Sequence, residues 1–384
     1  MSAGYERIVV SGSPEEIGRA YGSAARARIA RSRDAYAAVF LDATGWDWPR
    51  VRAAAERFVD PIRAYHQKYV REMQGIADGA GLELLDIVAL NVRSEIIFAA
   101  DASRAAEATR AFVPECSSLA LTAERTSESR MLVGQTWDWL PHALDTAIVL
   151  EVHQDEGPDY VTFVEAGLLA KVGMNSSGIG LCANALVSDL DRGEPGVPFH
   201  VLLRAIFDAE SAADALLALG RCRRAGSGNY LIADRDGVVL DVEAMPGGHR
   251  EMAVLRPEDG RLVHTNHFIS PRTEPHDVAA TAMPDSHFRL ERLRQLTREE
   301  TLGREDIQAA FADHALYPFG VCTHPDPRQS ELHQWRTIAG LVMDVRHQKL
   351  WLAAGYPCSE PFVEYDLAAA LAKPSPIRLV KEPA

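Results

Sequence analysis

The sequence has few cysteines, no long apolar run and no excess of positive charge. Its 384 residues include five cysteines, an odd number at irregular spacing, which argues against a disulfide framework. No run of about 18 apolar residues is present, so we expect no membrane-spanning segment. The net charge of −14 argues against nucleic acid or an anionic membrane as a partner, because both require a basic surface.

The start of the chain, MSAGYERIVV, also lacks the basic and apolar regions of a signal peptide. We therefore expect a cytoplasmic protein with reduced thiols. What is present is a globular composition, 47% hydrophobic and 24% charged, over a length that can bury a large core. The sequence contains no internal repeat and no low-complexity segment.

The first hundred residues are expected to be helical. In GSPEEIGRAYG, Ser13 is the predicted N-cap, Pro14 takes the first helical position and Glu16 closes a capping box. Apolar residues then return every three or four positions, which predicts further helical sequence to about residue 40 and at 49–80 and 83–100.

After a predicted polar loop at 101–113, the chain is rich in short β-prone runs separated by turn residues. MNSSGIG is typical of a hairpin turn, and a second hairpin is predicted around Asp236 and Gly237. Helices are expected between the strands at about 197–219, 284–298 and 305–313. Because hairpins link many strands, we predict antiparallel sheets with helices packed outside them, an α+β fold.

Cys116 lies where the predicted loop meets the first of these strands, in AFVPECSSLALT. Most cysteines are inert and buried, so an ordinary core thiol is one interpretation, as it is for Cys182 and Cys358. A nucleophile is the other, because a side chain at this boundary is held by a rigid sheet. If the bond between Glu115 and Cys116 were broken, the new α-amino group, with a pKa of about 7.7–8, could act as the general base.

Two further polar side chains lie in β-prone segments. Asp138 lies between two tryptophans in GQTWDW, where a buried carboxylate would need a partner such as the α-ammonium group of Cys116. Asn184 lies in the apolar run GIGLCANAL, where its amide could stabilise an oxyanion. The alternatives are a strand-end aspartate before Pro141 and a core asparagine that ties a loop together.

Other motifs carry weaker signals. His264 and His267 in HTNH would face opposite sides of a strand, so a metal site is not expected there, and we predict no bound metal. Cys322 and His324 in VCTHPDPRQS form a rival nucleophile pair, since one intervening residue on an extended chain points both side chains the same way.

In this order, PECSS, GQTWDW, KVGMNSSGIGLCANAL, RLVHTNHF and DSHFRLERL resemble the acyl-coenzyme A:6-aminopenicillanic acid acyltransferase family. That family belongs to the N-terminal-nucleophile hydrolases and is distantly related to bile salt hydrolases and penicillin V acylases. GSPEEIGRAYG and LDIVALNVRSEI also look like its helical leader, so the resemblance spans nearly the whole chain. It implies a four-layer αββα sandwich and self-cleavage before Cys116, with 1–115 as light chain and 116–384 as heavy chain, together one compact domain.

The resemblance also implies roles for single residues. Cys116 matches the nucleophile, Asp138 the aspartate that steadies the new α-amine, and Asn184 the oxyanion asparagine. Asn266 matches a second active-site asparagine, and Arg289 matches an arginine near the nucleophile.

Three positions qualify this match. Arg292 is close enough to Arg289 in the sequence to compete for its role. Gln135 stands where bile salt hydrolases carry an arginine. Glu115 stands where the penicillin enzyme has glycine, a residue that eases strain at a scissile bond.

The implied activity is that of a cysteine amidohydrolase or acyltransferase. The thiolate of Cys116 attacks an amide or thioester carbonyl, Asn184 stabilises the oxyanion, and the acyl-enzyme passes its acyl group to water or an amine. Gln135, Trp137 and Trp139 are expected to line the substrate pocket. No cofactor is needed, although a coenzyme A thioester could be the acyl donor.

The expected partner is a small-molecule amide or acyl thioester, and association of identical copies is compatible with the sequence. Two alternatives stay open. One is a non-catalytic or unprocessed binding protein on the same scaffold, and the other is a metal-dependent hydrolase.

Overall fold

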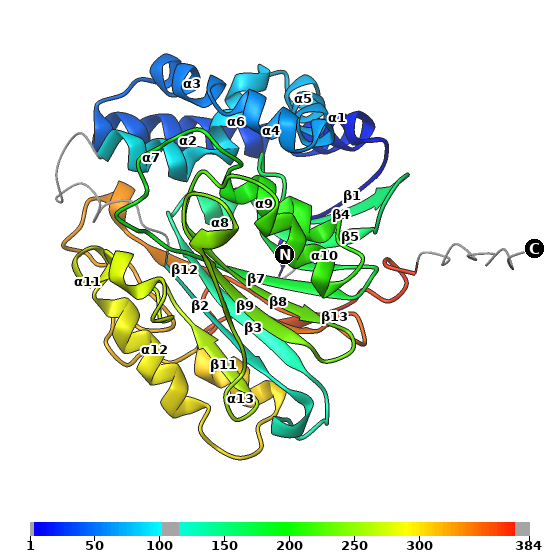
Figure 1. The fold of residues 1–384 in the computed structure, drawn as a ribbon, viewed down its shortest axis with the longest axis vertical. Coiled ribbons are helices and arrows are strands. Elements are labelled where there is room, and N and C mark those ends of the chain that lie inside the picture. The colour runs from blue at the N-terminus through cyan, green and yellow to red at the C-terminus, as the bar shows by residue number, and fades with distance from the viewer. Residues whose placement is uncertain (1–3, 102–114, 373–384) are drawn as a thin grey trace, which may run out of the picture.

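Two β-sheets stack face to face at the centre of the molecule, and helices cover the outer face of each sheet (Figure 1). The structure is a computed structural model, and it describes residues 4–101 and 115–372. Most of the predicted loop at 101–113 therefore lies outside the described residues. The four layers confirm the α+β sandwich predicted from the sequence. None of the helices in the described ranges combines the length and the hydropathy needed to cross a membrane.

The first sheet is the larger one. In spatial order its eight strands are β1 (Arg7–Gly12), β4 (Ala147–Gln154), β5 (Tyr160–Glu165), β6 (Val172–Asn175), β7 (Ile179–Ala185), β8 (Gly228–Asp234), β9 (Val239–Ala244) and β10 (Met252–Leu255). Both predicted hairpins are present, one between β6 and β7 and one between β8 and β9. Neighbouring strands are antiparallel as predicted, except that β1 and β4 run parallel.

The second sheet is antiparallel throughout. In spatial order its six strands are β11 (Arg261–His264), β2 (Glu115–Leu121), β3 (Leu132–Trp139), β12 (Arg336–Asp344), β13 (Lys349–Ala354) and β14 (Phe362–Asp366). Strand β3 is buried along its whole length. Both of its faces are covered, one by β7 of the first sheet and one by a helix, so the polar side chains of this strand are buried as well.

The helices form the two outer layers (Figure 1). Over the first sheet lie α1 (Pro14–Ala24), α2 (Arg26–Thr44), α3 (Trp48–Glu56), α4 (Val59–Tyr65), α5 (Gln67–Ala80), α6 (Leu84–Asn91), α7 (Arg93–Asp101), α9 (Phe199–Phe207) and α10 (Ala212–Gly220). The second sheet is covered by α12 (Asp285–Leu296) and α13 (Arg304–Phe311). Two single-turn helices are α8 (Ala143–Thr146) and α11 (Ala279–Ala282).

Helix α1 begins as predicted. Ser13 is its N-cap, and the Glu16 carboxylate accepts from the backbone N–H of Ser13 at 2.9 Å, which closes the capping box. The prediction that the first hundred residues are helical is wrong at β1. This strand is completed by parallel pairing with β4, about 140 residues later, a partner that local periodicity does not reveal. The helical stretch predicted at 49–80 is present, divided into the three helices α3, α4 and α5.

Helices α1 and α5 approach each other closely because both carry glycines four residues apart. A methyl group on Gly18 would collide with the carbonyl oxygen of Glu72, and one on Gly22 would collide with that of Ile76. Gly75 and Gly79 on α5 meet the α1 backbone in the same way. Only glycine permits this backbone contact. The contact between α1 and α5 holds the N-terminal helices against the first sheet.

Candidate active site

Cys116 is the second residue of β2, near the end of the strand at which the chain enters the second sheet. Antiparallel pairing with β3 sets Cys116 opposite Trp137 and Glu115 opposite Asp138. The Cys116 side chain is fully buried in the intact chain. The strand register therefore brings the predicted nucleophile and the predicted carboxylate onto neighbouring strands.

Three side chains from three different elements converge on the backbone of Cys116. The N–H of Cys116 donates to Asn266 Oδ1 at 2.8 Å. Its carbonyl oxygen accepts from Asn184 Nδ2 at 3.1 Å and from the Arg289 guanidinium at 3.0 Å. Asn184 comes from β7, Arg289 from α12, and Asn266 from the segment that follows β11. Parts of the chain that are far apart in sequence thus meet at one residue.

These side chains are themselves held in place. The Arg289 guanidinium also donates to Asn266 Oδ1 at 3.1 Å and pairs with the Asp285 carboxylate at 2.9 Å. Asn184 Oδ1 accepts from Ser118 Oγ at 2.8 Å, which links β7 to β2 across the two sheets. Buried polar groups with several partners have fixed rotamers, so the arrangement around Cys116 is preorganised.

Asp138 is fully buried next to this cluster. Its carboxylate accepts a hydrogen bond from the hydroxyl group of Thr337 on β12. Burial raises the pKa of Asp138 to about 7, and the nearby positive charge of Arg289 acts in the opposite direction. In the intact chain the acceptor for the Cys116 N–H is Asn266, while Asp138 lies across from Glu115.

Lys171 is a buried cation near the thiol. Burial raises the pKa of the Cys116 thiol to about 11, and the charge of Lys171 opposes this rise. The Lys171 ammonium group has a lowered pKa because it is itself buried. Its nitrogen lies 5.4 Å from the centroid of the Trp137 ring and 5.5 Å from that of the Phe199 ring. A neighbouring cation favours the thiolate form of a cysteine.

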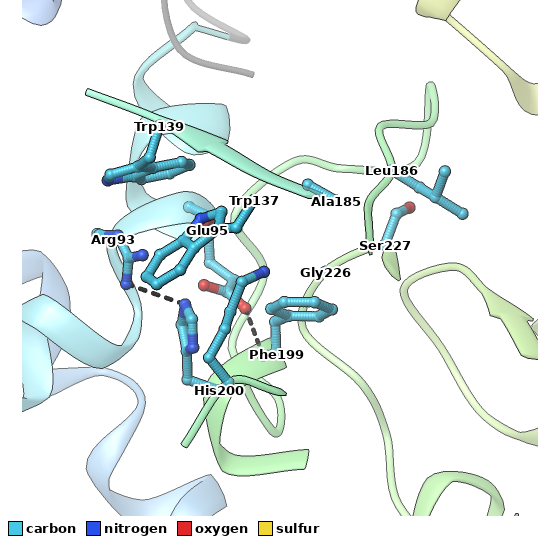
Figure 2. A pocket seen from close by; sticks show the side chains of 12 residues that line it. Arg93, Glu95, Trp137, Trp139, Ala185, Leu186, Phe199, His200, Gly226 and Ser227 are labelled. Atoms are coloured by element: carbon cyan, nitrogen blue, oxygen red, sulfur yellow. Dashed lines mark hydrogen bonds between the residues drawn. The ribbon is translucent and has the colours of Figure 1, made fainter. Parts of the chain in front are cut away.

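A cavity adjoins this site, and aromatic side chains form much of its wall (Figure 2). Trp137, Trp139 and Phe199 line it together with Lys171. About 20 Å³ of the cavity admits the centre of a water molecule, which is room for about one water. Trp137 connects the cavity to the candidate nucleophile, because it is the residue opposite Cys116 on β3.

Charged side chains complete the wall (Figure 2). The Arg93 guanidinium lies 4.9 Å from the centroid of the Trp139 ring and contacts His200 Nε2 at 2.9 Å. The Glu95 carboxylate accepts from the backbone N–H of Phe199 at 2.7 Å, and burial raises its pKa to about 7. Arg93, Glu95 and His200 were not predicted as site residues, because they lie in ordinary helices without a motif. Lys171, just before β6, was missed for the same lack of a motif.

Neither Gln135 nor Arg292 lines this cavity. Gln135 Oε1 accepts from the backbone N–H of Ala183 on β7 at 2.7 Å, so it joins the two sheets and is not among the residues that line the cavity. Arg292 pairs with Asp313 at 2.6 Å. Of the two candidate arginines, Arg289 is the one that contacts Cys116.

The two histidines of HTNH have separate partners. His264 Nε2 contacts Glu243 Oε1 at 3.0 Å, and His267 Nδ1 contacts Ser286 Oγ at 2.8 Å. Strand β11 ends at His264, so His267 lies outside the strand in which both were predicted.

The rival pair does come into contact. Cys322 Sγ lies 3.6 Å from His324 Nε2. His314 and Cys358 are close to the same ring nitrogen, so Cys322 is part of a cluster of four cysteine and histidine side chains.

Two stacked sheets between two layers of helices are the αββα architecture of the N-terminal-nucleophile hydrolases. The chain belongs to the acyl-coenzyme A:6-aminopenicillanic acid acyl-transferase family, whose sequence model matches residues 125–358. It is therefore an enzyme of acyl transfer or of amide C–N hydrolysis.

Similarity to a known acyltransferase extends over most of the chain. The 40 kDa form of acyl-coenzyme A:6-aminopenicillanic-acid-acyltransferase from Emericella nidulans is 25% identical over 351 residues, 91% of this chain and 92% of the relative. Among solved structures, a mutant of conjugated bile acid hydrolase from Clostridium perfringens is 12% identical, with a TM-score of 0.43 over 65% of this chain and 96% of that one. Penicillin V acylase from Agrobacterium tumefaciens is 12% identical, with a TM-score of 0.34 over 62% of this chain and 83% of that one.

Proposed function

We propose that the protein is a self-processing cysteine N-terminal-nucleophile enzyme. It cleaves the bond between Glu115 and Cys116, and Cys116 then carries the acyl group during turnover. Residues 1–115 become a light chain and residues 116–384 a heavy chain, and both stay in one compact domain.

The observation that carries this proposal is the convergence of Asn184, Asn266 and Arg289 on the backbone of Cys116. Burying an arginine and two amides is unfavourable unless each finds partners. An inert core thiol would not require these three groups at its own N–H and carbonyl. A residue whose backbone nitrogen becomes an α-amine requires groups that fix that amine and the carbonyl beside it.

Processing is a transfer from nitrogen to sulfur followed by hydrolysis. The Cys116 sulfur attacks the carbonyl carbon of Glu115, the peptide C–N bond breaks, and a thioester forms while the nitrogen takes up a proton as the new α-amine. Water then attacks the thioester, which releases the Glu115 carboxylic acid and restores the thiol. The thiol proton can pass to the departing nitrogen, so neither a metal nor a cofactor is needed for the step.

The new α-amine is the general base for turnover. Its pKa is about 7.7–8 in an unperturbed chain, so an appreciable fraction is neutral near pH 7. Asn266 Oδ1 already accepts from the Cys116 nitrogen, and the buried Asp138 carboxylate can balance the charge when that nitrogen is an ammonium group. Lys171 stabilises the thiolate that attacks the substrate.

Turnover passes through an acyl-enzyme. The thiolate attacks the carbonyl carbon of an amide or an acyl thioester, and the leaving amine or thiol takes a proton from the α-ammonium group. The side-chain amide of Asn184 has two N–H protons. One is donated to the Cys116 carbonyl oxygen, and the other is donated to the oxyanion. The aromatic wall of Trp137, Trp139 and Phe199 suits an apolar acyl group, and a coenzyme A thioester fits as acyl donor.

The test uses the purified protein with aliphatic and aromatic acyl-coenzyme A thioesters and with N-acyl amides, each with and without 6-aminopenicillanic acid as amine acceptor. Mass spectrometry of the quenched enzyme should show an acyl adduct on the peptide that begins with Cys116. A free acid as product indicates a hydrolase, and a new amide indicates an acyltransferase. Cys222→Ala, at a half-buried thiol elsewhere, should behave as the wild type.

If the processed protein forms no adduct on Cys116 with any donor, and iodoacetamide does not label Cys116 either, the proposed nucleophile is wrong. The alternative is then a binding protein on the same scaffold. Full burial of the thiol in the intact chain predicts this inert behaviour for a protein that is never cut.

A further inference from the structure

Four potential metal ligands, none of them among the residues assigned above, meet at one end of the second sheet. His314, Cys322 and His324 belong to the segment between α13 and β12, and Cys358 belongs to the loop between β13 and β14. Their ligand atoms all lie within 4.8 Å of one another. We propose that these four side chains bind one Zn²⁺ ion, or a similar thiophilic divalent cation, in a tetrahedral Cys₂His₂ site.

The three separations measured from His324 Nε2 suit tetrahedral zinc. With Zn–S bonds of about 2.3 Å and Zn–N bonds of about 2.0–2.1 Å, tetrahedral angles put S and N about 3.6 Å apart and two N atoms about 3.3 Å apart. His324 Nε2 lies 3.6 Å from Cys322 Sγ and 3.6 Å from Cys358 Sγ. It lies 3.0 Å from His314 Nε2. All three separations are within about 0.3 Å of the values for a shared ion.

Hydrogen bonds alone do not account for this cluster. His324 Nε2 carries either one proton or one lone pair, so it can make one good hydrogen bond. Three polar atoms nevertheless approach it, namely His314 Nε2, Cys322 Sγ and Cys358 Sγ. An ion at the centre gives each of the four atoms its own bond, with the two sulfurs as thiolates and the two rings neutral.

The ligand set predicts a structural role. Two cysteines and two histidines fill the four positions that zinc prefers, which leaves no open position for a substrate or a water molecule. A closed site of this kind stabilises the fold and does not activate water. The proposal therefore differs from the metal-dependent hydrolase considered from the sequence, and it replaces the prediction that the chain binds no metal.

The cluster is tied to Asp138 by a short chain of contacts. Thr323, between Cys322 and His324, donates its backbone N–H to Thr337 Oγ1 at 2.8 Å, and the Thr337 hydroxyl donates to Asp138. The backbone N–H of Thr337 donates in turn to the carbonyl of Thr323 at 2.9 Å. A metal ion that fixes this segment would also fix the partner of the buried carboxylate.

The loop that carries Cys358 also packs against the cluster. The ring of Tyr356 stacks on His324, with centroids 4.3 Å apart and planes 11° from parallel. Cys358 and His314 are exposed, whereas Cys322 is buried. The site therefore lies at the surface, where an ion can enter, and its two outer ligands can be replaced without opening the core.

The test is a titration of the full-length reduced protein, first stripped of metal with a chelator, with Co²⁺ and then Zn²⁺. One equivalent of Co²⁺ should give a thiolate-to-cobalt charge-transfer band and the intense visible bands of tetrahedral coordination, and Zn²⁺ should displace it. Cys358→Ser and His314→Ala should weaken metal binding by about a hundredfold or more, since even the loss of a group that only orients a ligand costs about 10–100-fold. Circular dichroism of the metal-free variants checks that they fold.

Two matched controls test whether metal binding depends on the cluster or on any cysteine or histidine of the chain. Cys222→Ser removes a half-buried cysteine, and His276→Ala removes a partly exposed histidine that pairs with Asp189. Both should bind one equivalent with the wild-type spectrum. The proposal fails if the folded wild type shows no stoichiometric tetrahedral spectrum, or if Cys358→Ser and His314→Ala bind as well as the controls. A Cys322–Cys358 disulfide that persists under reducing conditions would also overturn it.

Discussion

Two buried cysteines of the second sheet and its loops, Cys116 and Cys322, differ in what surrounds them. Around Cys116 lie amides and an arginine that contact its backbone, and a lysine near its sulfur. Around Cys322 lie the ring of His324 and the thiol of a second cysteine, both close to the sulfur itself.

The difference shows that burial and residue type do not decide what a cysteine does. Hydrogen-bond donors at a carbonyl, with a cation beside the sulfur, suit a thiolate that attacks carbon. Cysteine and histidine side chains that approach one another closely suit a sulfur that binds a metal ion. Variants at the two sites should separate these two roles.

The largest effect is expected for Cys116→Ala. Without the sulfur neither processing nor acyl transfer can start, so the rate should fall by at least about four orders of magnitude. The chain should stay uncut and keep its fold, because a buried thiol is replaced by a methyl group of similar polarity. Gel electrophoresis, circular dichroism and a turnover assay check this, with Cys222→Ala as the control. Turnover near the wild-type level in Cys116→Ala would remove Cys116 from the mechanism.

Asn184→Ala should have the next largest effect. It removes the amide proton assigned to the oxyanion, so kcat should fall about 10²–10³-fold. Asn175→Ala is a matched buried control, because Asn175 Nδ2 ties β6 to the carbonyls of Phe207 and Ala209 at 3.0 and 2.8 Å. That variant should lower Tm and keep kcat at a temperature well below its Tm. Equal kcat values for the two variants would contradict the role of Asn184.

Asp138→Asn should slow processing about 10–100-fold, because it removes one charged group that interacts with the reacting nitrogen. In the intact chain the pKa of Asp138 is raised to about 7, so the carboxylate is lost as pH falls below 7. The processing rate of freshly synthesised wild-type chain should therefore fall from pH 8 to pH 5, and the variant should lack this dependence. A pH profile shared by both proteins would show that another group controls the rate.

The processing rate should rise with pH, whereas the contribution of Asp138 to the stability of the folded chain should fall with pH. Because the folded-state pKa of Asp138 lies above its usual 3.8, the folded chain holds the proton more tightly than the unfolded chain. The contribution of Asp138 to stability therefore falls as pH rises from about 4 to 7 and stays low above 7. In the uncut Cys116→Ala background, adding Asp138→Asn should raise Tm relative to that background more at pH 8 than at pH 5. A Tm difference independent of pH would contradict the burial of a titrating carboxylate.

The smallest effect is expected at the Cys322 cluster. A chelator should lower the Tm of the wild type by several degrees, because bound metal stabilises only the folded state. It should leave the Tm of Cys358→Ser unchanged, since that variant has already lost the site. An equal response in both proteins would mean that the chelator acts elsewhere.

The sequence drew attention to three of the residues that meet near Cys116, but not to the cluster at Cys322. Cys116, Asp138 and Asn184 lie in β-prone segments, and polar groups in such segments are conspicuous in the sequence alone. Cys358 is 34 residues from His324, and no zinc spacing marks the four ligands. Two loops bring them together, so only the tertiary structure shows the group.

The fold, too, was predicted correctly where local sequence determines it and missed where a distant segment does. The N-cap at Ser13 and the hairpin at Asp236 follow from local chemistry, and both were predicted correctly. Strand β1 was missed because its hydrogen-bond partner is β4, far along the chain. The cavity lysine, Lys171, was missed because a single lysine in a β-prone run gives no signal until its aromatic neighbours are known.

The most direct test of the central claim is the intact mass of the purified wild-type protein, measured under denaturing conditions. Self-processing predicts two chains, one that ends at Glu115 and one that begins at Cys116, and a single uncut chain for Cys116→Ala. A wild-type protein that remains one chain of full mass, while turning over acyl substrates, would contradict the claim that Cys116 acts as a new N-terminus.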